Sequence, residues 1–458
     1  MARHQGNKGD TGETGSLFPD FVEDTPTAQD IERRLLVAPA PRLRQPVREQ
    51  VFLRPVSLEE LIGDDHQARV VWACVEELDL SALYRRIKAV EGHAGRAATD
   101  PKVFLALWLL ATLDGVGSAR TLERMCRESA AYQWMCGGIG VNYHTLADFR
   151  VEHEEVLEEL LSQGVAALMA EGLVDLKRVA QDGMRVRASA GSSSFRRGKT
   201  LKECLREARR QVRHLREEIE HDPAGTNRRQ QAARERTATE RLERVRKALR
   251  RLPEQTAKKK PKEKETARAS TTDAEATVMK MADGGFRPAY NLQLATDTKT
   301  QVIVGVDVST SGSDQGQMAP MVKQLKERYQ RAPHQILVDG GFIKKEDIER
   351  VAAPDLGCIV FAPVAKPRVE GIDPFAPKPE DSKVIAEWRQ RMGTEEAKQI
   401  YKERAATAEC VNALARNRGL QRLPVRGRRK VRAVALLFAL AHNLLRTVAL
   451  RALVAQPA

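Results

Sequence analysis

Two aspartates stand next to glycine after strand-like sequence, where a carboxylate could take part in chemistry. Asp339 follows the branched apolar residues 336–338, and Asp182 follows the short strand candidate 176–180. In open α/β sheets, functional side chains gather beyond the carboxyl ends of strands, so each aspartate is expected at a strand end. Carboxylate oxygens suit Mg²⁺, which can activate a hydroxyl nucleophile and neutralise a leaving oxygen. With further carboxylates beside them, these residues would favour metal-assisted cleavage of a phosphodiester.

Each of these motifs taken alone also fits a plain turn. Aspartate and glycine are ordinary turn residues, and Asp339 would equally cap a helix that begins near Lys344. The choice between a turn and a metal site depends on whether Asp339 has acidic partners close to it in space.

A predicted helix over residues 394–418 supplies a third carboxylate, Glu409. At about 100° per residue, the side of the helix that carries Glu409 also carries Tyr401, Asn412 and Arg416, with Arg404 at its edge. The opposite side is apolar. Packing of that apolar side on the sheet would turn Glu409 toward Asp182 and Asp339. Three carboxylates repel one another without a cation, so their convergence would indicate bound divalent metal.

The elements around these residues predict an α/β fold. Alternating apolar residues predict a hairpin of two strands over residues 286–296 and 301–310, and residues 318–329 have the pattern of an amphipathic helix. Residues 336–338 and 358–363 predict two further strands. This order of strands and helices is typical of a mixed sheet with helices packed on it.

Two other regions have helical periodicity. Residues 66–170 predict several helices, and helix, tight turn and helix in a basic protein fit either a helix-turn-helix-like module that binds DNA or a structural bundle. Apolar residues at heptad spacing over 201–219 and 238–252 predict an antiparallel coiled-coil hairpin, inserted because sheet-like sequence returns after it. Its arginine-rich exterior fits either contact with DNA phosphates or a solvated coiled-coil face.

The composition restricts partners and compartment. A chain of 458 residues has room for two or three domains, and its formal net charge of +14 favours a polyanionic partner, nucleic acid ahead of a membrane surface. Six cysteines without a C-x-x-C pair argue against a zinc site and fit a reducing compartment. No signal peptide is visible, and the apolar run 433–441 is too short to span a membrane, so a buried C-terminal helix is expected.

Several motifs, in this order along the chain, resemble those of bacterial insertion-sequence transposases of the DDE type. The residues that carry the resemblance are 66–150 (an N-terminal helical domain ending in TLADFR), Asp182-Gly183, 289–293, Asp339-Gly340-Gly341-Phe342, Tyr401 with Arg404, Glu409 and Arg416, and the C-terminal FALAHNLLR at 438–446. Arg416 stands where the family's tyrosine–arginine–glutamate–lysine signature has its lysine, which keeps the charge but changes the geometry. The resemblance implies an RNase H-like mixed-sheet catalytic core, an N-terminal helical domain and the inserted antiparallel coiled-coil hairpin.

The resemblance also implies roles for individual residues. Asp182, Asp339 and Glu409 would be the catalytic triad and would bind two Mg²⁺ or Mn²⁺ ions. The residues expected to bind DNA are Tyr401, Arg404, Arg416, Asn412, Tyr290 and Asn291.

As a DDE transposase, the protein would cleave DNA at the ends of its element and transfer the freed strand into target DNA. Its partners would be the terminal inverted repeats, the target DNA and a second copy of the chain in a synaptic complex. It would be cytoplasmic and associated with the nucleoid, with no membrane partner. The alternatives are a catalytically inactive transposase-derived DNA-binding protein and a structure-selective nuclease on the same RNase H-like fold.

The sequence predicts four parts in this chain. They are a loosely packed N-terminal segment over 1–50, a helical, helix-turn-helix-like DNA-binding domain over 51–170, the catalytic core over 171–198 and 267–458, and the coiled-coil hairpin with its basic linker over 199–266.

Overall fold

The computed structural model describes residues 29, 55–89, 92, 97–221, 228–367 and 371–455. The predicted N-terminal segment over residues 1–50 lies outside this described part, apart from residue 29. Residues Val56–Ala458 form one compact unit by their contacts, and the fold is that of this unit.

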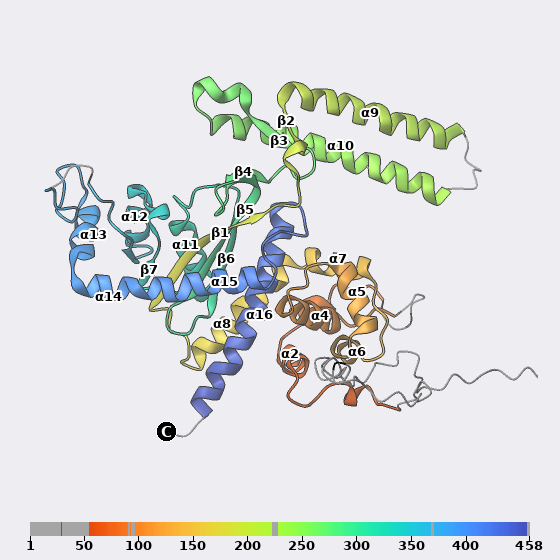
Figure 1. The fold of residues 1–458 in the computed structure, drawn as a ribbon, viewed down its shortest axis with the longest axis horizontal. Coiled ribbons are helices and arrows are strands. Elements are labelled where there is room, and N and C mark those ends of the chain that lie inside the picture. Colours follow the sequence, from red (N-terminus) through yellow and green to blue (C-terminus); the bar gives the residue numbers. More distant parts are fainter. Residues whose placement is uncertain are drawn as a thin grey trace, which may run out of the picture. The chain divides into compact units, whose positions relative to one another are not determined.

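A mixed sheet of six strands lies at the centre of the fold (Figure 1). Its strands are β1 (Arg178–Arg187), β4 (Thr277–Lys280), β5 (Phe286–Asp297), β6 (Ile303–Ser309), β7 (Gln335–Leu337) and β8 (Ile359–Phe361). The order is β4-β5-β1-β7-β8, and β6 pairs with β5 off this path. Pairing is antiparallel between β1, β4, β5 and β6, and parallel from β1 through β7 to β8. The predicted mixed α/β fold and the predicted β5–β6 hairpin are therefore confirmed.

The prediction for β1 was wrong at its carboxyl end. The strand was expected to stop before Asp182, but β1 continues to Arg187 and pairs with β5 along its whole length, so Asp182 lies in its middle. Gly183 does not interrupt the strand, because polar side chains occupy the space that its missing Cβ leaves.

Helices cover the sheet, some between its later strands in the chain and the rest after β8. They are α11 (Met318–Tyr329), η4 (Gly340–Phe342), α12 (Lys345–Ala352), α13 (Lys383–Gly393), α14 (Glu395–Arg404), the π-helical turn η5 (Ala405–Glu409), α15 (Cys410–Asn417) and α16 (Arg428–Ala455). The single helix predicted over 394–418 is thus a continuous helical path of α14, η5 and α15 that contains a π-helical turn.

The N-terminal region of this unit is helical, as predicted. Its elements are η1 (Glu59–Leu61), α2 (Gln67–Glu76), α3 (Ser81–Tyr84), α4 (Pro101–Leu113), α5 (Ala119–Glu128), α6 (Ala130–Cys136), α7 (Tyr143–Glu152) and α8 (Glu154–Ala170). Side chains of α4, α7 and α8 share one apolar core with α16 and with strands β1, β5 and β6. The helical region is therefore packed directly on the sheet.

The C-terminal helix α16 is long and apolar enough to cross a membrane by length and composition alone. However, 61% of its most apolar window is buried inside the protein. Asn443 on this helix accepts a hydrogen bond from the Ile303 amide at 2.8 Å and donates to the Ile303 carbonyl at 2.8 Å, which ties α16 to β6. The helix is part of the protein core, as the sequence predicted.

Two long helices leave the core between β1 and β4. Their elements are η2 (Ser192–Ser194), β2 (Phe195–Arg197), α9 (Gly198–His221), α10 (Arg228–Ala257), η3 (Pro261–Thr266) and β3 (Arg268–Ser270). β2 and β3 form a small two-stranded sheet. Apolar side chains of α9 and α10 pack together, among them Ala208, Val212, Ala238 and Leu242. Residues 198–257 are called the arm below.

Candidate active site

Strand pairing brings the two predicted aspartates together. β1 and β7 are parallel, with Ala180 opposite Leu337. Asp182 and Asp339 each come two residues later, so the same register carries both carboxylates to neighbouring positions. This arrangement follows from long-range pairing and could not be read from either strand alone.

Asp339 both caps a turn and faces the candidate site. Its Oδ1 accepts a hydrogen bond from the Gly341 amide at 2.8 Å, which caps the short η4 turn. Its Oδ2 lies 3.7 Å from Arg404 Nη2, and 40% of the side chain is exposed. The capping role that the sequence left open therefore uses one oxygen and leaves the other free for a cation.

Glu409 reaches the same place because of the π-helical turn. In such a turn, residues five apart stack, whereas in an α-helix they would point in different directions. Arg404 comes directly before η5 and Glu409, five residues later, is its last residue; Arg404 Nη1 lies 3.3 Å from Glu409 Oε1. The Glu409 side chain is 64% exposed, so it stands at the open side of the carboxylate group.

Arg404 lies at the centre of the three carboxylates. Its guanidinium is 3.8 Å from Asp182 Oδ2, in addition to its contacts with Asp339 and Glu409. Its side chain is only 11% exposed, and its Nε is buried without a hydrogen-bond partner in the described part of the chain. A single positive charge thus offsets the mutual repulsion of three acids, at a position where a bound cation would do the same.

Asp182 is the most enclosed of the three acids. Its Oδ2 accepts a hydrogen bond from Asn412 Nδ2 at 2.9 Å, and its Oδ1 accepts one from the Gly183 amide at 2.9 Å. Burial raises the pKa of Asp182 to about 6, while the charge of Arg404 acts against the rise and that of Asp339 adds to it. A carboxyl group with this pKa gains from a nearby cation, because positive charge favours the ionised form.

No group of three or more His, Cys, Asp or Glu side chains in the described residues is arranged closely enough to hold a metal ion. The chemistry of the donors still fits a divalent cation. All three acids offer oxygen, and Asn412 Oδ1 is buried without a hydrogen-bond partner among the described residues. Arg404 already occupies the space between the acids as a positive group.

Sequence reasoning missed a fourth carboxylate, Asp314, beside Gly183. Asp314 Oδ1 accepts hydrogen bonds from Asn291 Nδ2 at 2.6 Å and from Gln293 Nε2 at 2.7 Å, and the residue is 8% exposed. A Cβ added at Gly183 would lie 2.1 Å from Asp314 Oδ1. The signal that could have found this cluster is a glycine inside a strand whose partner strand carries two buried amides.

The residues predicted to bind DNA are in different environments. Tyr290 and Asn291 are completely buried, because β5 is covered on both faces, and Tyr290 donates to Asp273 Oδ1 at 2.7 Å. Asn412 is 4% exposed. Tyr401 is half-buried and its hydroxyl donates to the Val338 carbonyl at 3.1 Å. Arg416 is exposed on α15.

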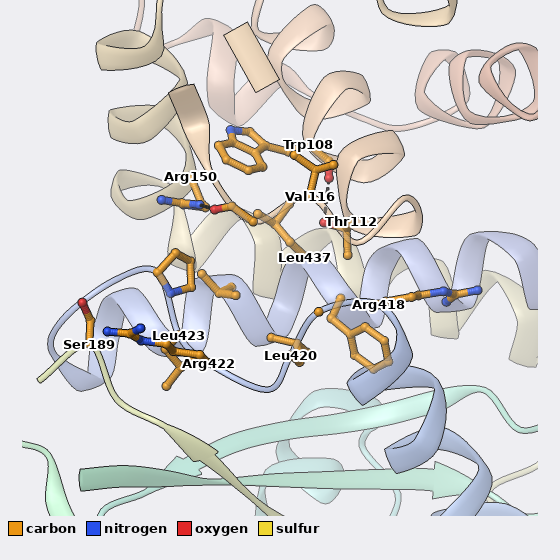
Figure 2. A pocket seen from close by; sticks show the side chains of 15 residues that line it. Trp108, Thr112, Val116, Arg150, Ser189, Arg418, Leu420, Arg422, Leu423 and Leu437 are labelled. Atoms are coloured by element: carbon orange, nitrogen blue, oxygen red, sulfur yellow. Dashed lines mark hydrogen bonds between the residues drawn. The ribbon is translucent and has the colours of Figure 1, made fainter. Parts of the chain in front are cut away.

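A separate cavity of about 410 Å³ lies between α4, α7 and the segment that joins α15 to α16 (Figure 2). Its described lining contains three arginines and no carboxylate: Arg150, Arg418 and Arg422. Arg150 Nη1 donates to the Gly117 carbonyl at 2.5 Å. The cavity is therefore not part of the carboxylate group.

Two protein-family models match the chain on either side of β1 and the arm. "Transposase domain (DUF772)" matches residues 56–152, and "Transposase DDE domain" matches residues 266–444. No curated protein and no solved structure gives a significant match. Asp339 and Glu409 fall inside the second matched range, and Asp182 lies before it.

The N-terminal helical region, the mixed sheet and the two family matches together define an enzyme that acts on DNA. A DDE domain implies an RNase H-like core and the use of divalent metal ions. The chain belongs to the DDE transposases of insertion sequences, which cleave DNA and transfer strands. Its DNA substrate places its action in the cytoplasm.

Proposed function

We propose that Asp182, Asp339 and Glu409 are the catalytic and metal-binding triad of this transposase. The observation that carries the proposal is the position of Arg404, whose guanidinium lies within 3.8 Å of all three carboxylates. Residues from two strands and one helix would have no structural reason to converge on one cation unless the acids were needed together. A salt bridge that served only stability would require one acid.

The proposed ions are two Mg²⁺ or Mn²⁺, held by oxygens of the three acids. When bound, such ions activate the attacking hydroxyl and neutralise the leaving oxygen of the phosphodiester. Asn412 positions Asp182 by its hydrogen bond to Oδ2. In the metal-free protein, Arg404 keeps the acids from repelling one another, and its guanidinium would also be suited to hold a DNA phosphate bidentately.

Further residues on the same helical path are proposed to contact the DNA end. Arg416 is exposed one helical segment beyond Glu409, and Tyr401 lies beside Asp339 through its bond to the Val338 carbonyl. Tyr290 and Asn291, which are buried, are proposed to act from inside the protein. They hold Asp273 and Asp314 respectively.

The proposed division of the chain follows the elements. Residues 51–170 would be the helix-turn-helix-like DNA-binding domain, 171–198 with 267–458 the RNase H-like core, and 199–266 an inserted antiparallel coiled-coil hairpin with its linker. The apolar contacts between α9 and α10 support the last of these. We propose a homodimer that pairs two terminal inverted repeats in a synaptic complex, near the nucleoid.

The decisive test compares Glu409→Gln with Glu396→Gln, a control on the same helical path whose side chain is exposed. The substrate is duplex DNA that carries the terminal repeats of the element, with Mg²⁺. Removing a residue that hydrogen-bonds to a metal ligand typically lowers metal affinity or activity about 10–100-fold. Loss of a ligand itself should therefore lower the nicking rate by at least about 100-fold. The control should nick at the wild-type rate, and both variants should bind the DNA.

Equal nicking by Glu409→Gln and wild type would refute the triad. No nicking by the wild type with binding retained would favour an inactive DNA-binding protein. Joining of the cut strand to a second duplex separates a transposase from a structure-selective nuclease, which would only cut.

A further inference from the structure

The base of the arm is fixed to the core, so the arm has a defined starting point. Leu201, Ala248 and Ala269 form a buried apolar cluster where α9, α10 and β3 meet. Arg251 Nη2 donates to Thr310 Oγ1 at 2.7 Å just after β6. The arm begins soon after β1, the strand that carries Asp182, and extends away from the sheet (Figure 1).

Four arginines form one stripe on α9, called the α9 stripe: Arg206, Arg209, Arg210 and Arg213. All four are exposed. Their spacing of three and four residues places them within about 100° of arc on the helix. Ala208 and Val212, which pack against α10, lie on the other side of α9. The α9 stripe therefore points away from the partner helix.

The four arginines of the α9 stripe have no acidic partner among the described residues, unlike several other arginines of the arm. No ion pair joins any of its four members to another residue in the described part of the chain. Five other arginines of the arm each pair with a glutamate: Arg216 with Glu235, Arg241 with Glu207, Arg244 with Glu240, Arg246 with Glu243 and Arg251 with Glu254. Like charges three and four residues apart destabilise a helix, so the unpaired stripe is unfavourable for the arm by itself.

The shape of this surface also suits a polyanion. The α9 stripe lines a surface hollow of about 550 Å³ together with Glu203 and Glu207. Glu207 is directed across to Arg241 of α10, 3.7 Å away, so its charge is already compensated. An unpaired, aligned set of guanidinium groups is the arrangement that binds phosphate oxygens bidentately.

We infer that the α9 stripe is a binding site for the phosphate backbone of duplex DNA, outside the carboxylate group. The inference rests on the proposed function only in taking DNA as the polyanion. From Arg206 to Arg213 the helix rises by about 10 Å. Duplex DNA carries one charge per about 1.7 Å of its length, both strands counted, so a stretch of duplex as long as the stripe carries roughly six phosphates, enough to supply one to each arginine. Contacts of this kind set affinity and position and do not read sequence.

The test measures how DNA affinity of the full chain depends on salt, without divalent metal. The probe is a duplex of about 30 base pairs and arbitrary sequence. The stripe variant is R206Q/R209Q/R210Q/R213Q. The matched control is R216Q/R241Q/R244Q/R246Q, which removes the same charge from the same arm but takes only arginines that have acidic partners.

Each phosphate contact contributes about 0.9 to the slope of log affinity against log salt, so the stripe variant should lose about 3 to 4 in slope. The control should keep the wild-type slope. An unchanged slope in the stripe variant, or an equal loss in both variants, overturns the inference. A changed oligomeric state with an unchanged slope also overturns it and assigns the stripe to a second copy of the chain.

Two additions keep the outcome clear. If the quadruple variant is not folded by circular dichroism, R206Q/R213Q takes its place, with an expected loss of about 2 in slope. Because binding is measured without metal on DNA that lacks the terminal repeats, failure of the proposed triad would leave this result unchanged.

Discussion

Two aspartates on opposite faces of β1 have opposite environments. Neighbouring residues of a strand point to opposite faces, so Asp182 projects toward α15, while the empty Cβ position of Gly183 faces Asp314. Asp314 Oδ1 receives two short amide hydrogen bonds from β5. Asp182 Oδ2 has one amide donor and a guanidinium 3.8 Å away. Asp314 Oδ2 also has a guanidinium 3.8 Å away, that of Arg185. The contrast therefore lies in the donors: two buried amides of β5 converge on one oxygen of Asp314, whereas Asp182 has one donor on each oxygen and shares Arg404 with two other acids.

This difference separates a supporting group from a reactive one. A buried acid whose oxygen accepts from two buried amides contributes to stability, and its removal leaves those donors unsatisfied. An acid whose burial raises its pKa and which shares one arginine with two other acids lowers stability until a cation binds. The Asp314 face should therefore respond to mutation in stability, and the Asp182 face in cleavage and in pH dependence.

The largest expected effect is on the stability of Gly183→Ala. The new Cβ would lie 2.1 Å from Asp314 Oδ1 and 2.6 Å from Gln293 Nε2, so the network must break. Overpacking combined with lost buried hydrogen bonds should cost about 3 kcal/mol or more in the free energy of unfolding. Urea denaturation measures it. Gly340→Ala is the control, because its new Cβ would meet only Pro363 Cγ at 3.6 Å. Equal stability of the two variants would show that Asp314 is not fixed in place.

The second effect is the pH dependence that Asp182 brings to the metal-free protein. The folded protein holds this proton up to about pH 6 because burial raises the pKa, whereas the unfolded chain releases it near 3.8. Between these values the folded state binds more protons, so stability falls as pH rises. In the wild type, the free energy of unfolding should fall by about 2–3 kcal/mol over this pH range, and Asp182→Asn should remove that fall. Urea denaturation of both proteins at pH 4 to 7 with chelator tests this, and parallel curves would contradict it.

A third prediction compares the same substitution, aspartate to asparagine, at Asp314 and at Asp339. Asp314→Asn should cost about 1–3 kcal/mol, because the hydrogen bonds from two buried amides lose the negative charge of their shared acceptor and become weaker neutral ones. Asp339→Asn, at a side chain that is 40% exposed, should change stability by no more than about 0.5 kcal/mol. Nicking should show the reverse order, with Asp339→Asn the far more damaging change. If both variants lost stability and nicking in the same proportion, the two faces would not have separate roles.

Much of this arrangement was predictable from local sequence. The strands β5, β6, β7 and β8 and the helical path that carries Glu409 follow from apolar periodicity, and the order of the three acids follows from their motifs. Asp314 was not predictable, because it follows a short Ser- and Gly-rich loop that resembles any turn. Its role depends on β1, β5 and the start of α11 meeting in space.

The π-helical turn and the extent of β1 were also beyond local reasoning. A uniform rotation of about 100° per residue places Arg404 at the edge of the polar side. The π-helical turn η5 changes this rotation, so the Arg404 side chain comes to lie beside Glu409. β1 was predicted to end early because Asp and Gly usually end strands, yet its pairing with β5 continues through both. In each case tertiary contacts decide against the local preference.

The smallest expected effect comes from two tyrosines that each donate a hydrogen bond to a backbone carbonyl. Tyr401 donates to Val338, next to Asp339, at 3.1 Å, and Tyr329 of α11 donates to Val304 of β6 at 2.9 Å. Removing either hydroxyl should cost about 0.5–1.5 kcal/mol in unfolding free energy. Tyr401→Phe should in addition slow nicking several-fold, because Val338 fixes the approach of α14 to the carboxylates, while Tyr329→Phe should not. Equal nicking rates in the two variants would mean that this contact supports the fold and has no part in positioning Asp339.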